Sequence, residues 1–313
     1  MGSNQADNFN IDNRSSTIHD DTANLDSSMS TVKTNIADFI EALARDISAN
    51  NLIFPSFPDI TMRIRYALND PNISASKVAR IVGTEPVLSA QLLRLANSAS
   101  LYAGCRPVND LPTAIKRLGY ALVRNASIAL GIRQLAQDTH QSIMRVPLEE
   151  LWRHSIQVAA LSYVLAKRLT RLNPDTAMLA GLLHDIGMFY ILARANKYPD
   201  FFADEAILRN IPLQTHAQIS PAILESWDVP EEIITATRDH ATYDRIHYAP
   251  ADLTDVVMVA NILAKRGCPG TAGSAECPTF PPAFGRLNLD ATTCAAVMLR
   301  SEEEITLISQ VFC

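Results

Sequence analysis

The chain has 313 residues and a net charge of −6, and 48% of its residues are apolar but only 6% aromatic. This length allows two domains or one elaborate domain with a sizeable core, and the few aromatics together with 11 glycines argue against an all-β sandwich. The acidic balance excludes a general electrostatic attraction to nucleic acid or to an anionic membrane surface.

The sequence shows no sign of secretion or membrane insertion. No uninterrupted apolar run reaches the roughly 18–20 residues that a membrane span needs, and the first residues lack the basic and apolar segments of a signal peptide. We therefore expect a cytoplasmic protein. The cysteines are odd in number and show no CxxC spacing, which is typical of reduced thiols and not of a zinc ribbon or a disulfide framework. They are Cys105, Cys268, Cys277, Cys294 and Cys313.

The first part of the chain changes from a polar tail to a series of helices. Residues 1–30 are rich in Asn, Asp and Ser, which predicts a disordered polar tail. Residues 31–140 carry apolar side chains at helical spacing, punctuated by prolines, and predict a bundle of short helices. The predicted breaks lie at Asp70-Pro71 and near Gly83. The expected core stripes are Val87, Leu88, Leu92 and Leu95 in a helix opened by Thr84 and Pro86, and Ile115, Leu118 and Leu122 after Leu111-Pro112.

Residues 77–98 also have the outline of a helix-turn-helix, because two short helices meet at a glycine. A recognition helix needs polar or basic side chains that face the DNA groove. Here Arg94 is the one cation of the second helix, so DNA binding is the weaker interpretation.

The next segment, from about residue 141 to 266, contains the polar residues that carry chemistry. Glu149 is expected to open a helix that runs to Lys167 and that places His154 on an apolar stripe. Asn173 is expected to cap a second helix, which begins at Pro174 and contains His184 and Asp185. A histidine on an apolar stripe is, taken alone, more often a satisfied core residue than a ligand.

The second of these helices is expected to be buried on both sides. Met178, Leu179, Leu182, Leu183 and Ile186 cover one broad arc, and Ala177 and Gly181 leave room for another backbone on the other side. A buried His-Asp pair is costly unless it is hydrogen-bonded or bound to metal. With His154 on a facing helix, these groups form a candidate site for a divalent transition metal. The other interpretation is a closed polar network.

Later polar residues have weaker signals. Taken singly, His216 and His240 are each more typical of surface or capping histidines. Asp228 with Glu231 resembles a capping box that opens a helix, and Trp227 before it is expected to anchor that corner in the core. Asn261 interrupts an otherwise apolar run, 256–264, so it is expected to face the polar cluster. Residues 267–287 are predicted to be a loop, and a final helix is predicted from Glu302 to about Val311.

Two groups of motifs resemble the HDOD family, the HD-related output domains of bacterial signalling proteins. The first group comprises TEPVL at residues 84–88, LLRLANSA at 92–99 and AIKRLG at 114–119. The second comprises Leu151-Trp152 with His154-Ser155, GLLHDIG at 181–187 and WDVPEEI at 227–233. The resemblance covers about residues 50–265, and the motifs come in the family's order.

This resemblance implies an all-α fold with two lobes: an N-terminal lobe at 31–140 and an HD-like lobe at 141–266, followed by a loop and helix at 267–313. The HD-like lobe is similar to HD-type metal phosphohydrolases, whose metal ligands match His154, His184 and Asp185. The fourth ligand position falls on Asn261, an amide where the enzymes have a carboxylate. His216 and His240 match ligands of a second metal site in one branch of those enzymes.

Other positions depart from the enzyme pattern. Ala241 stands where that branch has a further histidine, no GYP segment follows, and Met188 replaces the lysine that commonly follows the HDIG motif. The resemblance therefore favours a non-catalytic signal-transduction module with a degenerate HD metal site, in which a divalent ion such as iron or manganese is not required.

The alternative is a metal-dependent phosphohydrolase that acts on a nucleotide or a cyclic dinucleotide, with Asp185 as its catalytic residue. The expected partners are a signalling protein or a small phosphorylated ligand, and a cleft between the two lobes is the natural place for either.

Overall fold

The computed structural model describes residues 59–98, 106–137, 144–194, 205–227, 229–248, 250–268 and 280–312, together with residues 39, 41, 42 and 45. The expected tail at 1–30 lies outside these residues. The chain divides into two compact units, 1–49 and 50–313. All features below belong to the second unit. No strand occurs in the described ranges, so the expected all-α class is confirmed.

The N-terminal helices of this unit pack around one long helix. They are α2 (Asp59–Leu68), α3 (Ala75–Val82) and α4 (Pro86–Ala96), and all three contact α6 (Leu111–Gln137), which is bent at Gly119. The predicted breaks after Leu68 and at Gly83 are confirmed. Leu88, Leu92 and Leu95 are buried as expected, but Val87 is 48% exposed because it lies on the face of α4 that points away from α6.

Two motif residues hold the end of α4 against α6. The side-chain amide of Asn97 donates to the carbonyl of Val108 and accepts from its N–H, both at 2.7 Å. Arg117 on α6 donates to the carbonyls of Ala96 and Arg106 at 2.9 and 2.7 Å. In this protein, residues of the LLRLANSA and AIKRLG segments therefore hold Arg106 and Val108, which precede α6, against the end of α4.

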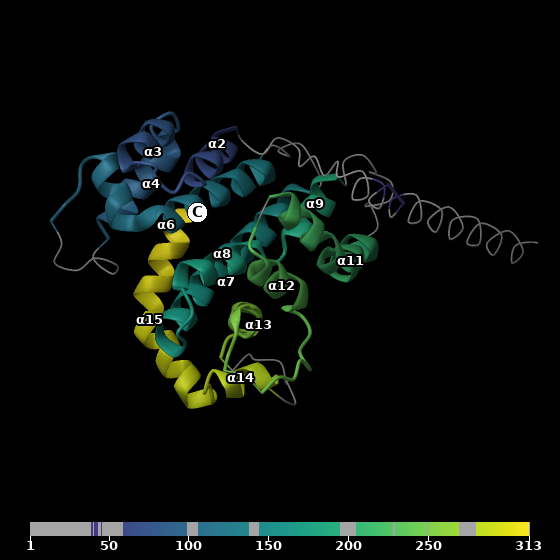
Figure 1. The fold of residues 1–313 in the computed structure, drawn as a ribbon. Coiled ribbons are helices and arrows are strands. Elements are labelled where there is room, and N and C mark those ends of the chain that lie inside the picture. The colour runs from purple at the N-terminus through teal and green to yellow at the C-terminus, as the bar shows by residue number, and fades with distance from the viewer. Residues whose placement is uncertain are drawn as a thin grey trace, which may run out of the picture. The chain divides into compact units, whose positions relative to one another are not determined.

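The second group of helices packs around α8 (Pro174–Leu183) and α9 (Ile186–Arg194), which are buried. The other helices of this group are α7 (Arg145–Leu169), α11 (Glu205–Ser226), α12 (Glu231–Asp239) and α13 (Leu253–Arg266) (Figure 1). Helix α8 packs most closely on α7, α11 packs on α9, and α12 and α13 cover α8. The expected cap is confirmed, because Asn173 accepts hydrogen bonds from the N–H groups of Asp175 and Thr176.

Helix α6 joins the two groups, and α15 fastens them. Helix α6 contacts α7, α8 and α9, and the Asn125 amide donates to the Asp175 carbonyl at 2.8 Å. Helix α14 (Pro282–Arg286) packs on α13, and α15 (Ala291–Phe312) runs along α7 and also touches α4 and α6 (Figure 1). Glu304 of α15, which is buried, pairs with Lys167 and Arg168 of α7 at 2.6 and 3.2 Å.

Several sequence-based boundaries were wrong. Helix α7 begins at Arg145 and not at Glu149, since Pro147 is tolerated in a first turn, where its missing N–H has no partner to lose. Helix α15 begins at Ala291 and not at Glu302, and α14 lies within the predicted loop.

The expected capping box at the start of α12 involves Asp228, whose contacts are not part of the described structure. The cap of this helix is Pro230, which makes no side-chain cap bond.

The stretch 174–194 is long and apolar enough to cross a membrane by length and composition, although, as expected, it is not an uninterrupted apolar run. Within the fold 83% of its most apolar window is buried. Protein surrounds these residues on both sides, which is the environment of core helices.

Candidate metal centre

Asp185 lies at the centre of a cluster of polar side chains, four histidines and one asparagine, contributed by five segments. Asp185 and His184 occupy the turn between α8 and α9, and not the middle of one helix as the sequence suggested. The helix is interrupted because the N–H of Gly187 donates to Oγ of Ser220 on α11 at 3.1 Å instead of continuing the helical pattern. The other members are His154 of α7, His216 of α11, His240 at the end of α12 and Asn261 of α13.

Two glycines bring these segments close together. A Cβ on Gly181 would lie 2.6 Å from Oγ of Ser162 and 2.9 Å from the carbonyl oxygen of Val158, so α8 and α7 are in backbone contact there. The expectation that Gly181 admits a neighbouring backbone is confirmed. A Cβ on Gly187 would lie 2.4 Å from the carbonyl oxygen of His216. The GLLHDIG motif thus needs both glycines for packing, and this packing aligns the histidines of α7 and α11 with Asp185.

One oxygen of Asp185 faces the ligands of the expected metal site. Oδ2 of Asp185 is 3.0 Å from Nε2 of His184 and 4.0 Å from Nε2 of His154. Nε2 of His154 is also 3.0 Å from Oδ1 of Asn261. Ligand atoms that share one transition-metal ion at roughly 2 Å each lie about 3–4 Å from one another. The four side chains therefore have the mutual spacing of a ligand set.

The other oxygen of Asp185 faces two further histidines. Oδ1 lies 3.5 Å from Nε2 of His216 and 3.4 Å from Nε2 of His240. Both histidines are buried, at 5% and 1% exposure, so neither is a surface residue, although His240 is the C-cap of α12. Asp185 thus separates two groups of side chains, each of which could hold a metal ion.

Backbone carbonyls fix the tautomers of two of the rings. Nδ1 of His184 lies 2.8 Å from the carbonyl oxygen of Gly181, and Nδ1 of His240 lies 2.7 Å from that of Thr237. A carbonyl can only accept a hydrogen bond, so both Nδ1 atoms carry the proton. In the neutral ring this leaves a lone pair on each Nε2, which lies 3.0 Å (His184) and 3.4 Å (His240) from the nearest oxygen of Asp185. A carbonyl that binds Nδ1 is the arrangement found behind metal-binding histidines.

The charges of the cluster also suit a metal. Burial lowers the pKa of His154 to about 4, and the nearby His184 adds to this effect. Burial likewise lowers the pKa of His184, although Asp185 opposes it. Burial alone would raise the pKa of Asp185, but His184 and His240 outweigh it and hold that pKa well below its ordinary value. Neutral imidazole and ionised carboxylate are the forms that bind metal.

The contact between His184 and Asp185 is the sharpest test of fit. Nε2 of His184 is buried and makes no hydrogen bond, although Oδ2 of Asp185 is only 3.0 Å away. A nitrogen lone pair this close to a carboxylate oxygen is repelled unless a cation offsets the contact. The donor set of nitrogens and oxygens, with this orphaned atom in it, fits a divalent transition metal.

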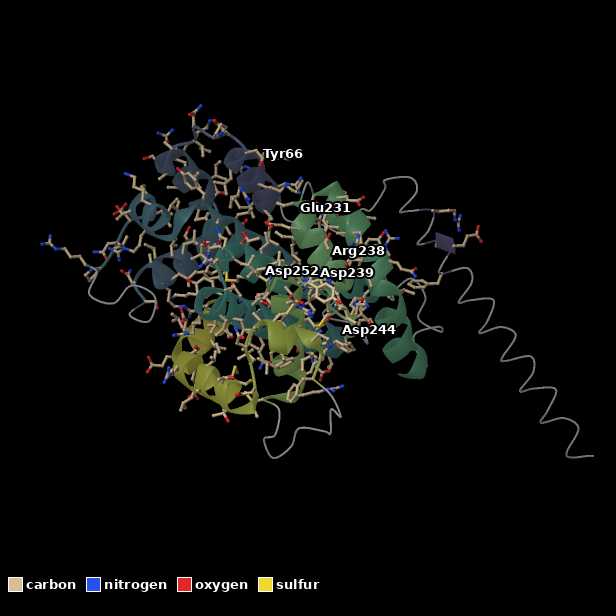
Figure 2. The ribbon with its side chains drawn as sticks, turned by 60° about the horizontal axis from the view of Figure 1, so that its bottom comes forward. Tyr66, Glu231, Arg238, Asp239, Asp244 and Asp252 are labelled. Atoms are coloured by element: carbon tan, nitrogen blue, oxygen red, sulfur yellow. The ribbon has the colours of Figure 1, made fainter. Side chains whose placement is uncertain are left out.

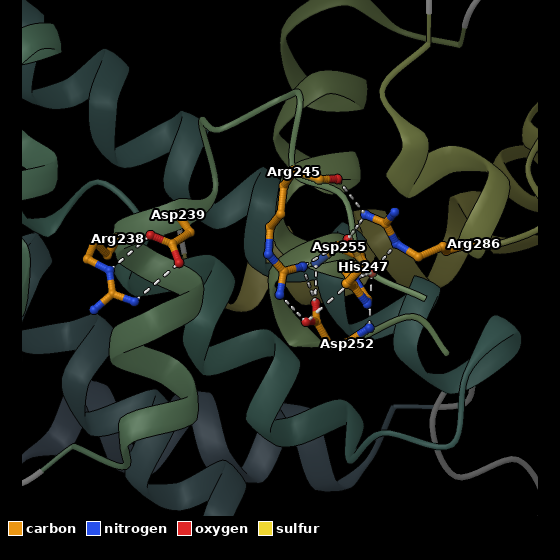
Figure 3. Close-up of polar contacts among 7 residues, drawn as sticks. All are labelled: Arg238, Asp239, Arg245, His247, Asp252, Asp255 and Arg286. Atoms are coloured by element: carbon orange, nitrogen blue, oxygen red, sulfur yellow. Dashed lines mark hydrogen bonds and ion pairs between the residues drawn. The ribbon is translucent and has the colours of Figure 1, made fainter. Parts of the chain in front are cut away.

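A third acidic group in the described chain does not fit a metal. His247, Asp252 and Asp255 also lie close together, but Arg286 donates two hydrogen bonds to Asp255 at 2.8 and 2.6 Å, and Arg245 pairs with both aspartates (Figure 3). A cation would have to displace two guanidinium groups. This cluster is a salt-bridge network that ties α14 and the 240–252 segment to the start of α13.

Comparison with known proteins agrees with the motifs and the fold. The family model of the HDOD domain matches residues 54–243. The chain belongs to the HDOD family. An HDOD domain protein of unknown function from Geobacter sulfurreducens is 26% identical in its crystal structure, with a TM-score of 0.61, and the match covers 86% of this chain and 97% of that one.

Two further proteins are similar to this chain. A candidate metal-dependent phosphohydrolase from Shewanella amazonensis SB2B has a TM-score of 0.70 at 24% identity over 90% of this chain and 100% of its own, which shows a shared fold. An uncharacterized protein of Treponema pallidum (strain Nichols) is 26% identical over 228 residues, or 66% of this chain. The chain spans 41% of the length of that relative.

Proposed function

We propose that this HDOD protein is a regulatory module that holds a divalent metal and does not hydrolyse phosphoesters. The observation that carries the metal is the orphaned Nε2 of His184, which lies 3.0 Å from Oδ2 of Asp185. His154, His184, Asp185 and Asn261 would hold the ion, and His216 and His240 offer a second position. When bound, such an ion supplies Lewis acidity and can lower the pKa of a water ligand.

Two features support a role without hydrolysis. The first is Asn261, whose neutral amide is a weaker ligand than the carboxylate of the enzymes it resembles and leaves the site with one negative charge, from Asp185. The second is enclosure: the side chains of His184 and Asp185 are 0% and 4% exposed, and His154 is the most accessible ligand at 18%. A phosphoester has little access past His154, so the metal is proposed to stabilise the arrangement of the five segments.

The alternative is a metal-dependent phosphohydrolase, and one observation favours it. Both oxygens of Asp185 face histidines, so the carboxylate could bridge two metal ions, as the ligands of two-metal phosphoesterases do. In that case Asp185 is the central catalytic residue and the substrate is a nucleotide or a cyclic dinucleotide.

Metal content and turnover, measured together, distinguish these functions. The purified protein is expected to contain about one equivalent of iron, manganese or zinc, to lose it in His184→Ala, and to leave bis(4-nitrophenyl) phosphate and cyclic dinucleotides unhydrolysed with added Mn²⁺. His247→Ala is the matched control, since it removes an imidazole outside the cluster and should keep the metal.

The two remaining results each contradict part of the proposal. Turnover that needs Mn²⁺ and disappears in His184→Ala and Asp185→Ala would establish the phosphohydrolase. A folded wild-type protein that binds no metal would contradict the proposal that the cluster holds a metal ion.

The family and the buried apolar helices support a proposal about where the protein works and what it acts on. We propose that the protein works in the cytoplasm and passes its signal to another protein. A pull-down with the wild type and with Asp185→Ala, identified by mass spectrometry, tests this; a partner that binds both equally would show that the metal cluster does not control the interaction.

A further inference from the structure

A hollow lies between α2 and α6 on one side and α8 with the segment between α11 and α12 on the other, and none of its lining residues belongs to the metal cluster. Its cavity volume is about 60 Å³, so it admits one small group and the rest of a ligand lies at its solvent-open mouth. One wall comes from α2 and α6. The other comes from Leu179 of α8 and from the segment between α11 and α12, at Trp227, Val229 and Pro230. We call it the inter-lobe hollow.

The location of the hollow can be followed in Figure 2. Tyr66 of α2 and Glu231 of α12 are labelled there, and each is the chain neighbour of a lining residue, Arg65 and Pro230. Trp227 was expected to be a core anchor, but it is half-buried because it forms part of this wall. A cleft between the lobes was expected from the sequence, and the hollow lies at that place.

The polar side of the hollow is cationic. Arg65 and Arg124 line it, with Asn69 beside them, and none of its ten lining residues is acidic. Nε of Arg124 is buried and has no hydrogen-bond partner among the described residues. A buried donor without an acceptor costs about 1–3 kcal/mol. An oxyanion supplies both the missing acceptor and the opposite charge, and the planar guanidinium suits phosphate and carboxylate.

The rest of the hollow is apolar and includes flat surfaces. Met62 and Ile128 line it on the side of the arginines, and Leu179 and Trp227 face them from the other lobe. An aromatic or other flat ring fits between such walls and gains from contact with the indole. The complementary ligand therefore has an anionic group at one end and a ring at the other.

We propose that the inter-lobe hollow is a binding site for a small anion that carries a flat ring, either a nucleoside phosphate or an aromatic carboxylate. The ligand touches both lobes, so it fixes one arrangement of α2 and α6 against α8. It also contacts the two segments that position metal ligands: Leu179 precedes His184 by five residues, and Trp227 lies between His216 and His240 in the chain. The site does not depend on whether metal is bound.

Four probes separate the anion from the ring in a calorimetric titration of the full chain. AMP carries phosphate and ring, indole-3-acetate carries carboxylate and ring, adenosine carries the ring alone, and inorganic phosphate carries the anion alone. We expect AMP or indole-3-acetate to bind at least about tenfold more tightly than either single-feature probe, a difference of ~1.4 kcal/mol. The tighter of the two identifies the anion. Equal or absent binding of all four overturns the proposal.

Variants locate the binding site. Arg124→Gln should weaken binding of the preferred anion by about tenfold or more, since charge-assisted hydrogen bonds are worth about 1.5–3 kcal/mol. Lys116→Gln is the matched control, because it removes a positive charge from an exposed position on the same helix. Unchanged binding in Arg124→Gln, or binding lost in His184→Ala alone, would assign the probe to another site and contradict the proposal.

A second variant guards against a failure of Arg124→Gln to fold. Asn69 is exposed at the edge of the hollow, so Asn69→Asp should fold normally while it adds a negative charge beside the anion. It should weaken binding of the anionic probes and leave the binding of adenosine unchanged. Equal affinity of the preferred anion for Asn69→Asp and the wild type would count against this site.

Discussion

At the scale of single residues, the state of a side chain depends on neighbours that are distant in sequence. His154, His184 and Asp185 could be selected from their motif, and Asn261 from its place in an apolar run. The same reasoning undervalued His216 and His240, because no local pattern shows that α11 and α12 turn both rings toward Asp185. The carbonyls of Gly181 and Thr237, which set the tautomers, leave no signal in the sequence at all.

Asp255 provides a residue-scale prediction about stability and pH. Its burial would raise its pKa, but hydrogen bonds from Arg286 and from the Asp252 backbone hold the pKa below its ordinary value (Figure 3). Asp255→Asn leaves two arginines without a carboxylate and should lower the free energy of unfolding by about 2–4 kcal/mol at pH 7. Urea unfolding measures this loss.

The pH dependence follows from the lowered pKa of Asp255. A carboxylate whose pKa is lower in the folded state than in the unfolded state stabilises the fold at pH values above its unfolded pKa of about 3.9. This contribution is lost as the pH falls through the folded pKa. The difference in stability between the wild type and Asp255→Asn should therefore shrink below about pH 4. A difference that stays constant from pH 7 to pH 3 would contradict the assignment.

At the scale of helices, the sequence located most elements but misplaced their ends. The buried stripes of α4 and α6 and the Asn173 cap are local features, so they were predictable. The start of α15 at Ala291 was missed, although Asp290 caps it: its side chain accepts from the N–H of Thr293 at 2.7 Å, and Thr293 Oγ1 accepts from the N–H of Asp290 at 2.8 Å. The break between α8 and α9 was also hidden, since it depends on Ser220 of α11 accepting from the N–H of Gly187.

Gly187 gives a prediction for the contact between α9 and α11. In Gly187→Ala the new methyl would lie 2.4 Å from the His216 carbonyl, so the helices must separate. Overpacking of this kind costs about 1–3 kcal/mol, and thermal unfolding should show a lower Tm. The control is Gly285→Ala on α14, where nothing lies within 4 Å of the added methyl and the Tm should hold or rise. Equal Tm changes in both variants would contradict the packing.

At the scale of the molecule, α15 connects the two groups of helices through its contacts with α7, α4 and α6. Glu304 is the charged centre of this connection, because it is buried while its partners Lys167 and Arg168 are partly exposed. The arrangement of the two groups around α6 was predictable in outline from the family resemblance. No motif or pattern in the sequence indicated that the last helix would bridge them.

Glu304→Gln should weaken this connection. Since the partner charges are partly solvated, the expected loss is about 1–2 kcal/mol, less than for a fully buried pair. Glu303→Gln is the control. Glu303 is next to Glu304 in the sequence but is exposed, so this substitution should change the free energy of unfolding by less than about 0.5 kcal/mol. Chemical denaturation of the full chain measures both. A Glu304→Gln variant as stable as its control would show that the pair contributes little.

The central claim is that a metal ion lies between His184 and Asp185. A crystal structure of protein purified without chelators, with diffraction collected on both sides of the iron, manganese and zinc absorption edges, tests it directly. The account predicts an anomalous peak bounded by Nε2 of His184 and Oδ2 of Asp185, with Nε2 of His154 and Oδ1 of Asn261 around it. A His184 ring turned to donate a hydrogen bond to Asp185, with no anomalous peak, would contradict it.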